Sequence, residues 1–276
     1  MVAPLEGPAP SHSGRGGLDR SAIMSGLTRR GTLRVPEVTA FFWILKGLST
    51  AMGEATSDYL VRVLHPVPAV LLGFVCFVGA LVVQFSRGRY VAWSYWLAVA
   101  VVGVFGTMAA DVLHVGLGVP YAASTPLFAV TLLVVFVSWQ RTEKTLSIHS
   151  IDTLRREAFY WAAVVATFAL GTAAGDLTAI TLHLGYFFAA LLFAGVIMIP
   201  AIGYRWANLN PILAFWFAYV VTRPLGASLA DGMGKPKIVG GLGWGDGAVS
   251  LAFSFVIVVL VAYLTVSGRD VQADRS

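Results

Sequence analysis

Cysteine and charge are both scarce in this sequence. Cys76 is the single cysteine, so a disulfide within one chain and a cysteine-ligated metal cluster are both excluded. Its side chain is expected to be buried as a small hydrophobe. Charged residues make up 12% of the chain, about half of their ordinary share of roughly 25% in soluble proteins. Hydrophobic residues make up 57% and the mean hydropathy is +0.77. These values predict an integral membrane protein.

Known signatures of catalysis and of nucleotide binding are missing as well. The sequence has no Ser-His-Asp spacing, no HExxH pair and no Rossmann fingerprint. The glycine-rich stretch GKPKIVGGLGWGDG at 234–247 lacks the GK[ST] ending of a phosphate-binding loop. We therefore expect no enzymatic activity. The stretch is interpreted as an irregular turn or as a lid over a site.

The net charge of +5 could suggest a nucleic-acid partner. The basic residues fall mainly in the tails and in the short segments between apolar runs, however. This distribution is typical of membrane topology and not of a nucleic-acid surface. The expected partner is therefore the lipid bilayer. The sequence leaves the oligomeric state open.

Eight apolar runs are long enough to cross a bilayer as helices. This predicts an all-α integral membrane protein with eight transmembrane helices. The runs cover residues 38–62, 67–86, 91–115, 121–140, 157–181, 184–204, 211–231 and 247–266.

The distribution of lysine and arginine predicts the orientation of these spans. If the N-terminus is cytoplasmic, Arg62, Lys235 and Lys237 are the cations that fall outside, and far more lie inside. Both termini are then cytoplasmic. The predicted parts are a disordered tail (1–36), a first membrane half (37–140), a cytoplasmic linker (141–156), a second membrane half (157–266) and a C-terminal tail (267–276). Met24 opens a basic segment of its own, and translation from either methionine stays an open alternative.

The odd-numbered spans share one pattern, W-x9-G-x4-D, which occurs four times without a gap. Asp58 and His65 lie seven residues apart, and so do Asp176 and His183, which relates the first copy to the third. Each copy consists of one such span and one plainer apolar span, so the chain is four two-helix repeats. The copies are Trp43, Gly53 and Asp58; Trp96, Gly106 and Asp111; Trp161, Gly171 and Asp176; and Trp216, Gly226 and Asp231.

Each repeat contains an even number of spans, so all four repeats are expected to have the same, parallel orientation. A pseudo-symmetry axis would then follow the membrane normal. The four aspartates would lie at one depth, near the outer ends of their helices. A carboxylate in a span costs about 2.5 to 3.5 kcal/mol near the membrane centre, and the C-terminal end of a helix disfavours it further. A cation or protons are therefore expected beside these aspartates.

Residues four positions before each aspartate share its helix face. They are Glu54, Thr107, Thr172 and Ala227. Together with the four aspartates, these oxygen ligands make the kind of site that Ca²⁺, Mg²⁺ or Mn²⁺ prefers. The predicted metal ligands are Asp58, Asp111, Asp176, Asp231 and Glu54, with Thr107 and Thr172 in support, and His114 could add a nitrogen ligand. A divalent cation is thus the one bound species that the sequence suggests.

A purely structural interpretation stays open beside this one. Lys46 and Arg223 also lie within predicted spans, eight residues before Glu54 and Asp231 respectively. Ion pairs between helices could therefore neutralise part of the acidic group. The glycines favour close helix packing, and the tryptophans favour packing or anchoring at the membrane interface.

The stretch VPEVTAFFWILKGLSTAMGEATSDYL, the four motif copies and the closing KPKIVGGLGWGDGAVS segment resemble a family of bacterial repeat proteins known as uncharacterised membrane-anchored proteins. The resemblance covers residues 35 to 266. It implies a multi-pass protein of the bacterial inner membrane and carries no activity with it.

The residues favour a transporter or exchanger of a small, divalent cation, with the carboxylates binding the ion and Lys46 and Arg223 tuning or gating it. One half of the molecule would rock against the other around the site. The alternative is a structural or partner-binding membrane protein without transport activity.

Overall fold

The computed structural model describes residues 33–272, and within them the regular secondary structure is helical. The predicted tail (1–36) lies almost entirely outside the described residues. Eight long helices match the eight predicted apolar runs to within a few residues. They are α2 (Ala40–Leu64), α3 (Pro66–Ser86), α4 (Ala92–Asp111), α5 (Tyr121–Glu143), α6 (Leu154–Asp176), α7 (Tyr186–Trp206), α8 (Pro211–Gly234) and α9 (Asp246–Ser267).

Short helical turns accompany the long helices. A π-helical turn continues α4 (η1, Val112–Gly116) and another continues α6 (η3, Leu177–Thr181), each beginning directly after a motif aspartate. Two 3₁₀ turns lie in loops, η2 (Ile148–Ser150) and η4 (Lys237–Val239). Such π-turns recur at functional sites in other proteins, which draws attention to Asp111 and Asp176.

Seven of the eight helices are long and apolar enough to cross a membrane. The exception is α2, which carries Lys46, Glu54, Asp58 and Arg62. This helix packs against α3, α4, α8 and α9, so it is the helix with least need of an apolar outer surface. The eight predicted helices are therefore present, and seven of them are apolar enough to span a membrane, whereas α2 carries too many charged residues.

The four helices that carry the motif form an inner ring in which α2 packs against α4, α4 against α6, α6 against α8 and α8 against α2. Each motif glycine lies at one of these contacts, where an added methyl group would collide with the next helix. The contacts pair Gly53 with Gly103, Gly106 with Phe168, Gly171 with Arg223, and Gly226 with Thr50. Close helix packing, predicted for the glycines, is therefore observed at every repeat.

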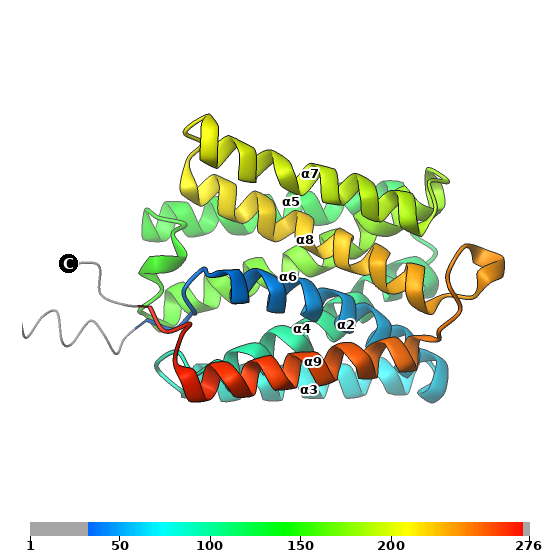
Figure 1. The fold of residues 1–276 in the computed structure, drawn as a ribbon, viewed down its shortest axis with the longest axis horizontal. Coiled ribbons are helices and arrows are strands. Elements are labelled where there is room, and N and C mark those ends of the chain that lie inside the picture. Colours follow the sequence, from blue (N-terminus) through cyan, green and yellow to red (C-terminus); the bar gives the residue numbers. More distant parts are fainter. Residues whose placement is uncertain (1–32, 273–276) are drawn as a thin grey trace, which may run out of the picture.

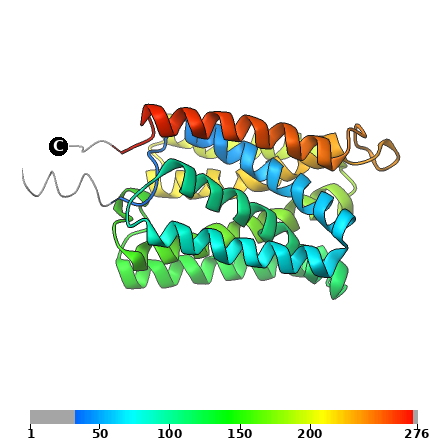
Figure 2. The same cartoon turned by 90° about the horizontal axis from the view of Figure 1, so that it is seen from below.

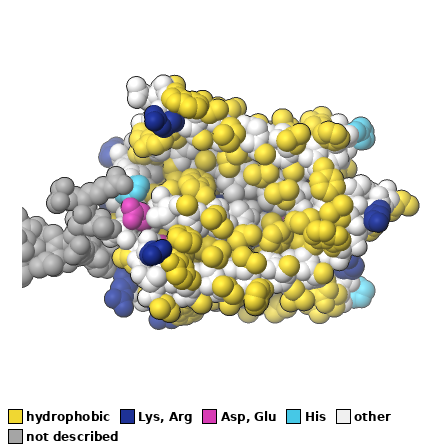
Figure 3. All heavy atoms as spheres, viewed as in Figure 1, with side chains coloured by type: hydrophobic (Ala, Val, Ile, Leu, Met, Phe, Trp, Pro, Cys, Tyr) yellow, Lys and Arg dark blue, Asp and Glu magenta, His cyan; other side chains and the backbone are white. Residues whose placement is uncertain are grey.

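The plainer helices α3, α5, α7 and α9 lie outside this ring, as Figures 1 and 2 show together. Each packs against the inner helix of the next repeat: α3 on α4, α5 on α6, α7 on α8 and α9 on α2. Their outward surfaces are strongly apolar; Val67, Leu191 and Phe255 are examples of exposed side chains. Figure 3 shows hydrophobic side chains spread over the long sides of the bundle, with cations near its ends. Cys76 is exposed on α3, so the expectation of a buried thiol was wrong.

The turns between helices repeat too. Seven residues after the aspartate of the first three repeats, the backbone enters the left-handed region, with φ of 65° at His65, 66° at Gly118 and 55° at His183. Glycine adopts this conformation most readily. The two histidines are exposed turn residues.

Both ends of the described chain lie at one end of the bundle (Figures 1 and 2). There, the Arg34 amide donates to the Ile151 carbonyl at 2.9 Å and the Glu37 amide to the Asp270 carbonyl at 2.8 Å. Motif tryptophans fill the adjoining core: Trp96, Trp161 and Trp216 are almost completely buried. The Trp96 ring packs on Phe42 and on Tyr95. Aromatic packing therefore closes this end of the inner ring.

Candidate cation site

Four levels of side chains follow the axis of the inner ring. They come 3, 7, 11 and 15 residues after each motif tryptophan, and this spacing keeps them on one face of each helix. The first three levels are buried. The levels are Lys46, Val99, Val164 and Tyr219; Thr50, Gly103, Phe168 and Arg223; Glu54, Thr107, Thr172 and Ala227; and Asp58, Asp111, Asp176 and Asp231.

Arg223 ties all four inner helices together. Its fully buried guanidinium forms a salt bridge with Glu54 on α2, with Nη2 2.6 Å from Oε2. The same nitrogen donates to Thr172 Oγ1 on α6 at 2.8 Å and contacts Thr107 Oγ1 on α4. Nη1 donates to the backbone carbonyl of Thr50 at 3.0 Å. We call Arg223 and these four partners the arginine clamp.

The ion pair between helices that the sequence left open for Arg223 therefore exists, and its partner is Glu54 on α2. Thr107 and Thr172, predicted as supporting ligands, lie in the clamp, where Thr107 also donates to Glu54 at 3.3 Å. Both threonine hydroxyls therefore already have partners within the protein, whereas Nε of Arg223 has none among the described residues.

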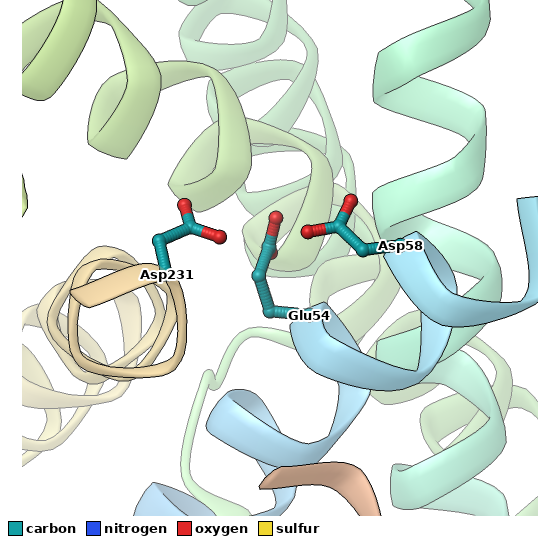
Figure 4. Close-up of side chains that lie close together, drawn as sticks. All are labelled: Glu54, Asp58 and Asp231. Atoms are coloured by element: carbon teal, nitrogen blue, oxygen red, sulfur yellow. The ribbon is translucent and has the colours of Figure 1, made fainter. Parts of the chain in front are cut away.

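Three carboxylates converge across this level and the next one out. Ligand oxygens of Glu54, Asp58 and Asp231 all lie within 4.8 Å of one another. Figure 4 shows Glu54 and Asp58 on neighbouring turns of α2 and Asp231 reaching toward them from α8. Three hard oxygen ligands at this separation could hold one divalent cation. We call these three residues the carboxylate cluster.

Asp111 and Asp176 lie beside the cluster and outside it. Each interacts electrostatically with Glu54, and the two interact with each other. The Tyr121 hydroxyl of α5 interacts with the Asp176 carboxylate. The four repeats thus bring all four aspartates to one end of the ring, and two of the four reach ligand distance of Glu54.

Lys235 reaches into the carboxylate cluster from the residue that follows α8. It forms a salt bridge with Asp58, and its Nζ lies 3.7 Å from Asp231 Oδ1. Burial lowers the pKa of Lys235, and the carboxylates of Asp58 and Asp231 raise it by more, so the net pKa lies above its ordinary value. The protonated amine therefore acts as a tethered counter-ion. Sequence reasoning missed this role, although Lys235 stands four residues after Asp231.

Lys46 is separate from the cluster. Its side chain is 1% exposed, and its ammonium nitrogen has no hydrogen-bond partner among the described residues. Instead it lies 4.0 Å from the centre of the Phe168 ring and 4.1 Å from that of Tyr219. Lys46 was considered as a member of an ion pair between helices, but it forms none among the described residues, and Glu54 pairs with Arg223. Cation–π contacts surround this side chain in place of a carboxylate.

His114 is also engaged away from the cluster. Its Nδ1 lies 2.9 Å from the Val119 carbonyl oxygen and its Nε2 3.2 Å from Ser124 Oγ. The ring packs on Tyr121 at 3.8 Å between centroids. Both ring nitrogens thus have protein partners, which fits a histidine that fixes the turn after η1 better than the nitrogen ligand considered above.

The glycine-rich loop folds back on the end of α8 beside the cluster. Backbone amides of Leu242, Trp244 and Gly245 donate to the carbonyls of Gly232, Met233 and Gly234 at 2.7, 3.0 and 3.1 Å. These bonds satisfy the carbonyls that a helix end leaves free. The loop closes with a salt bridge between Arg62 and the buried Asp246. It lies at the opposite end of the bundle from the chain ends (Figure 1).

Comparison with known proteins gives one match. No curated protein and no solved structure matches the chain. A family described as "Repeat of Unknown Function (DUF347)" matches residues 94–145, 159–209 and 214–270, which together make up more than half of the chain. These segments correspond to the second, third and fourth repeats, and the motif at Trp43, Gly53 and Asp58 adds a copy before them. The expected membership in an uncharacterised repeat family is confirmed: the chain belongs to the DUF347 repeat family.

Proposed function

We propose that this protein is a multi-pass membrane transporter or exchanger of a small, divalent cation, and that the carboxylate cluster binds the ion. The observation that carries the proposal is the convergence of Glu54, Asp58 and Asp231 within 4.8 Å, with a lysine ammonium already held between two of them. A site that attracts the ammonium of Lys235 has the charge to attract a metal cation.

Membrane insertion is supported by seven helices of sufficient length and apolarity and by the exposed apolar side chains on the outer helices. The cyclic glycine contacts join equivalent positions of successive repeats, which supports four parallel repeats around an axis along the membrane normal. The excess of cations on one side supports cytoplasmic termini. The resemblance to bacterial membrane-anchored repeat proteins supports a location in the bacterial inner membrane.

The local charge balance favours a bound cation. Five carboxylates lie at the outer two levels of the ring, from Glu54 and the four aspartates, and two cations pair with them, Arg223 and Lys235. Asp58 and Lys235 are partly accessible at this end, with 17% and 24% of their side chains exposed. A divalent ion entering here would neutralise more charge than Lys235 alone.

Lys235 suggests how ions are exchanged. A metal ion that binds Asp58 and Asp231 displaces the ammonium, and the ammonium returns when the ion leaves. Lys235 is also joined to the glycine-rich loop, since its backbone carbonyl accepts from the Gly243 amide at 2.9 Å. The aromatic core closes the opposite end of the ring, so passage requires a second arrangement in which the repeats shift against one another.

One observation favours a structural role, without transport, for the residues of the arginine clamp. The arginine clamp joins all four helices through hydrogen bonds and a salt bridge, as a network that stabilises a bundle would. We assign Glu54 to both roles and the aspartates to ion exchange. An enzymatic role forms no part of this proposal.

Transport and metal content test the proposal together. Purified protein should contain a divalent metal by elemental analysis, and proteoliposomes should take up Mn²⁺, Mg²⁺ or Ca²⁺. Asp231→Asn and Asp176→Asn should abolish uptake while the variants remain folded, and Asp152→Asn, which changes a loop carboxylate away from the site, should keep it. Aspartate variants that lose stability, in a protein without bound metal or uptake, would support the structural alternative.

A further inference from the structure

The Lys46 ammonium is a buried positive charge on the axis of the inner ring. Its side chain is 1% exposed, and no described group accepts a hydrogen bond from it. The Phe168 and Tyr219 rings cover it, with their centres 4.0 and 4.1 Å from Nζ. An ammonium group can donate three hydrogen bonds, and here two cation–π contacts replace them. The charged side chain therefore costs free energy at this place that a neutral amine does not.

Arg223 connects Lys46 to the carboxylate cluster. Its guanidinium carbon lies 5.2 Å from the centre of the same Phe168 ring, and its charge repels the Lys46 ammonium. The salt bridge with Glu54 partly neutralises the arginine. A divalent ion bound to Glu54 withdraws negative charge from this salt bridge, so the repulsion between Arg223 and Lys46 increases. Ion binding at the cluster thus favours loss of the Lys46 proton.

A row of tyrosine hydroxyls begins beside Lys46. Tyr219 shares its level on the axis, and Tyr95 and Tyr160 each stand one residue before a motif tryptophan, nearer to the chain ends. The Tyr160 hydroxyl contacts that of Tyr95 and interacts with that of Tyr219. The Tyr219 hydroxyl has no hydrogen-bond partner among the described residues, so the row is open at this link. Because each hydroxyl can both donate and accept, such a row can pass a proton once the link closes.

Tyr90 and Asp270 continue the row toward the end of the bundle that holds both chain ends. The Tyr90 ring packs on that of Tyr95 at 5.6 Å between centroids, and its hydroxyl donates to the Asp270 carboxylate. Arg223 is the charged group that faces Lys46 from the helices packed on α2. Their remaining titratable side chains lie elsewhere: Cys76 on the outer surface, Asp111 and Asp231 at the carboxylate cluster, Asp246 beside Arg62, and Tyr263 beside Arg269.

We propose that Lys46 is the proton-exchange site of this transporter, releasing its proton when a divalent ion binds the carboxylate cluster and binding a proton when the ion leaves. The step breaks one N–H bond of the ammonium and leaves a neutral amine. The proton passes along the tyrosine row to water at the end of the bundle that holds both chain ends. This role rests on the proposed cation transport, to which it adds the proton as coupling ion.

Proton release on Mn²⁺ binding tests this role, measured with a pH indicator on the purified full chain in weakly buffered detergent at a series of pH values. Calorimetry gives the amount of bound ion. At the pH of largest difference, the unchanged protein should release up to about one proton more per bound ion than Lys46→Met. Lys46→Arg should resemble Lys46→Met, since a guanidinium stays protonated. Lys144→Met changes an exposed lysine after α5 and should match the unchanged protein.

The route of the proton has a test of its own. Tyr160→Phe removes the hydroxyl between Tyr95 and Tyr219 and should slow proton release in stopped-flow measurements without changing its amount. Tyr204→Phe, which changes an exposed tyrosine of α7, should leave the rate as it is. Equal rates in the two variants would overturn the tyrosine row as the path.

The outcomes separate the role of Lys46 from the cation site itself. Equal proton release from the unchanged protein and both Lys46 variants, with Mn²⁺ bound to all three, would overturn this role and leave the cation site in place. Absence of Mn²⁺ binding to the unchanged protein would overturn the proposed function, and the role of Lys46 with it.

Discussion

Arg223→Met should destabilise the inner ring strongly because it removes the group that joins all four helices. The guanidinium contacts Glu54, Thr107, Thr172 and the Thr50 carbonyl, and the substitution leaves the buried Glu54 carboxylate without this partner. Removing one member of a buried ion pair costs about 3 to 5 kcal/mol. The free energy of unfolding should therefore fall by about this amount.

The double variant Glu54→Gln with Arg223→Met tests the cause of this loss. It removes both charges, so its cost should be smaller than the sum of the two single costs by about 1 to 3 kcal/mol. Lys46→Met is the matched control, because Lys46 is equally buried but its amine has no hydrogen-bond partner in the described chain. It should cost less than about 1 kcal/mol, since methionine retains contact with the aromatic rings.

Reversible unfolding in mixed detergent micelles, followed by circular dichroism, measures these differences. Additive effects of Glu54→Gln and Arg223→Met would refute the coupling. A loss from Lys46→Met as large as that from Arg223→Met would show that any buried charge in the ring has the same effect, and the arginine clamp would have no special role.

Three more substitutions test packing and pH dependence. Gly226→Ala should destabilise the protein by about 1 to 3 kcal/mol because its new methyl group collides with Thr50. Gly79→Ala on α3 is the control, because its methyl group meets no atom within 4 Å. It should stabilise the protein by up to about 1 kcal/mol in the same unfolding assay. Burial raises the pKa of Asp270 above its ordinary value of 3.8. The folded state therefore holds the proton of this carboxyl group more tightly than the unfolded state does. The free energy of unfolding consequently falls as pH rises from 3.8 through the raised pKa. Asp270→Asn should remove that fall and keep an acceptor for Tyr90, and an unchanged pH profile of the melting temperature would contradict the assignment.

Hydropathy and the motif spacing predicted most of the fold. Apolar runs in a membrane protein must satisfy their own backbone hydrogen bonds, so run length determines helix position closely. The fixed interval between tryptophan, glycine and aspartate predicted the repeats, and each glycine lies at an equivalent contact. The charged residues of α2 could be read from the sequence, but which neighbours would bury them could not, since burial by other helices depends on tertiary packing.

The candidate site was predicted in part. Glu54, Thr107 and Thr172 each stand four residues before a motif aspartate, and this spacing predicted that they share a level. Which side chains pair between helices depends on how far each side chain extends, and the spacing does not encode this. Arg223 could pair with Asp231 on its own helix or with Glu54 across the ring, and the structure has the second. Lys235 lies outside the apolar run, in a loop whose path back over α8 depends on backbone hydrogen bonds that hydropathy does not encode.

Binding of Mn²⁺ to the purified protein, measured by isothermal titration calorimetry for the unchanged chain and for Lys235→Met, tests the cation site most directly. Removing the tethered ammonium frees Asp58 and Asp231, and a charged hydrogen bond is worth about 1.5 to 3 kcal/mol. Lys235→Met should therefore bind the ion more tightly by roughly tenfold or more, and Asp231→Asn should bind it more weakly. Absence of Mn²⁺ binding in both the unchanged chain and Lys235→Met, or equal affinity in the two, would contradict a cation site in the carboxylate cluster.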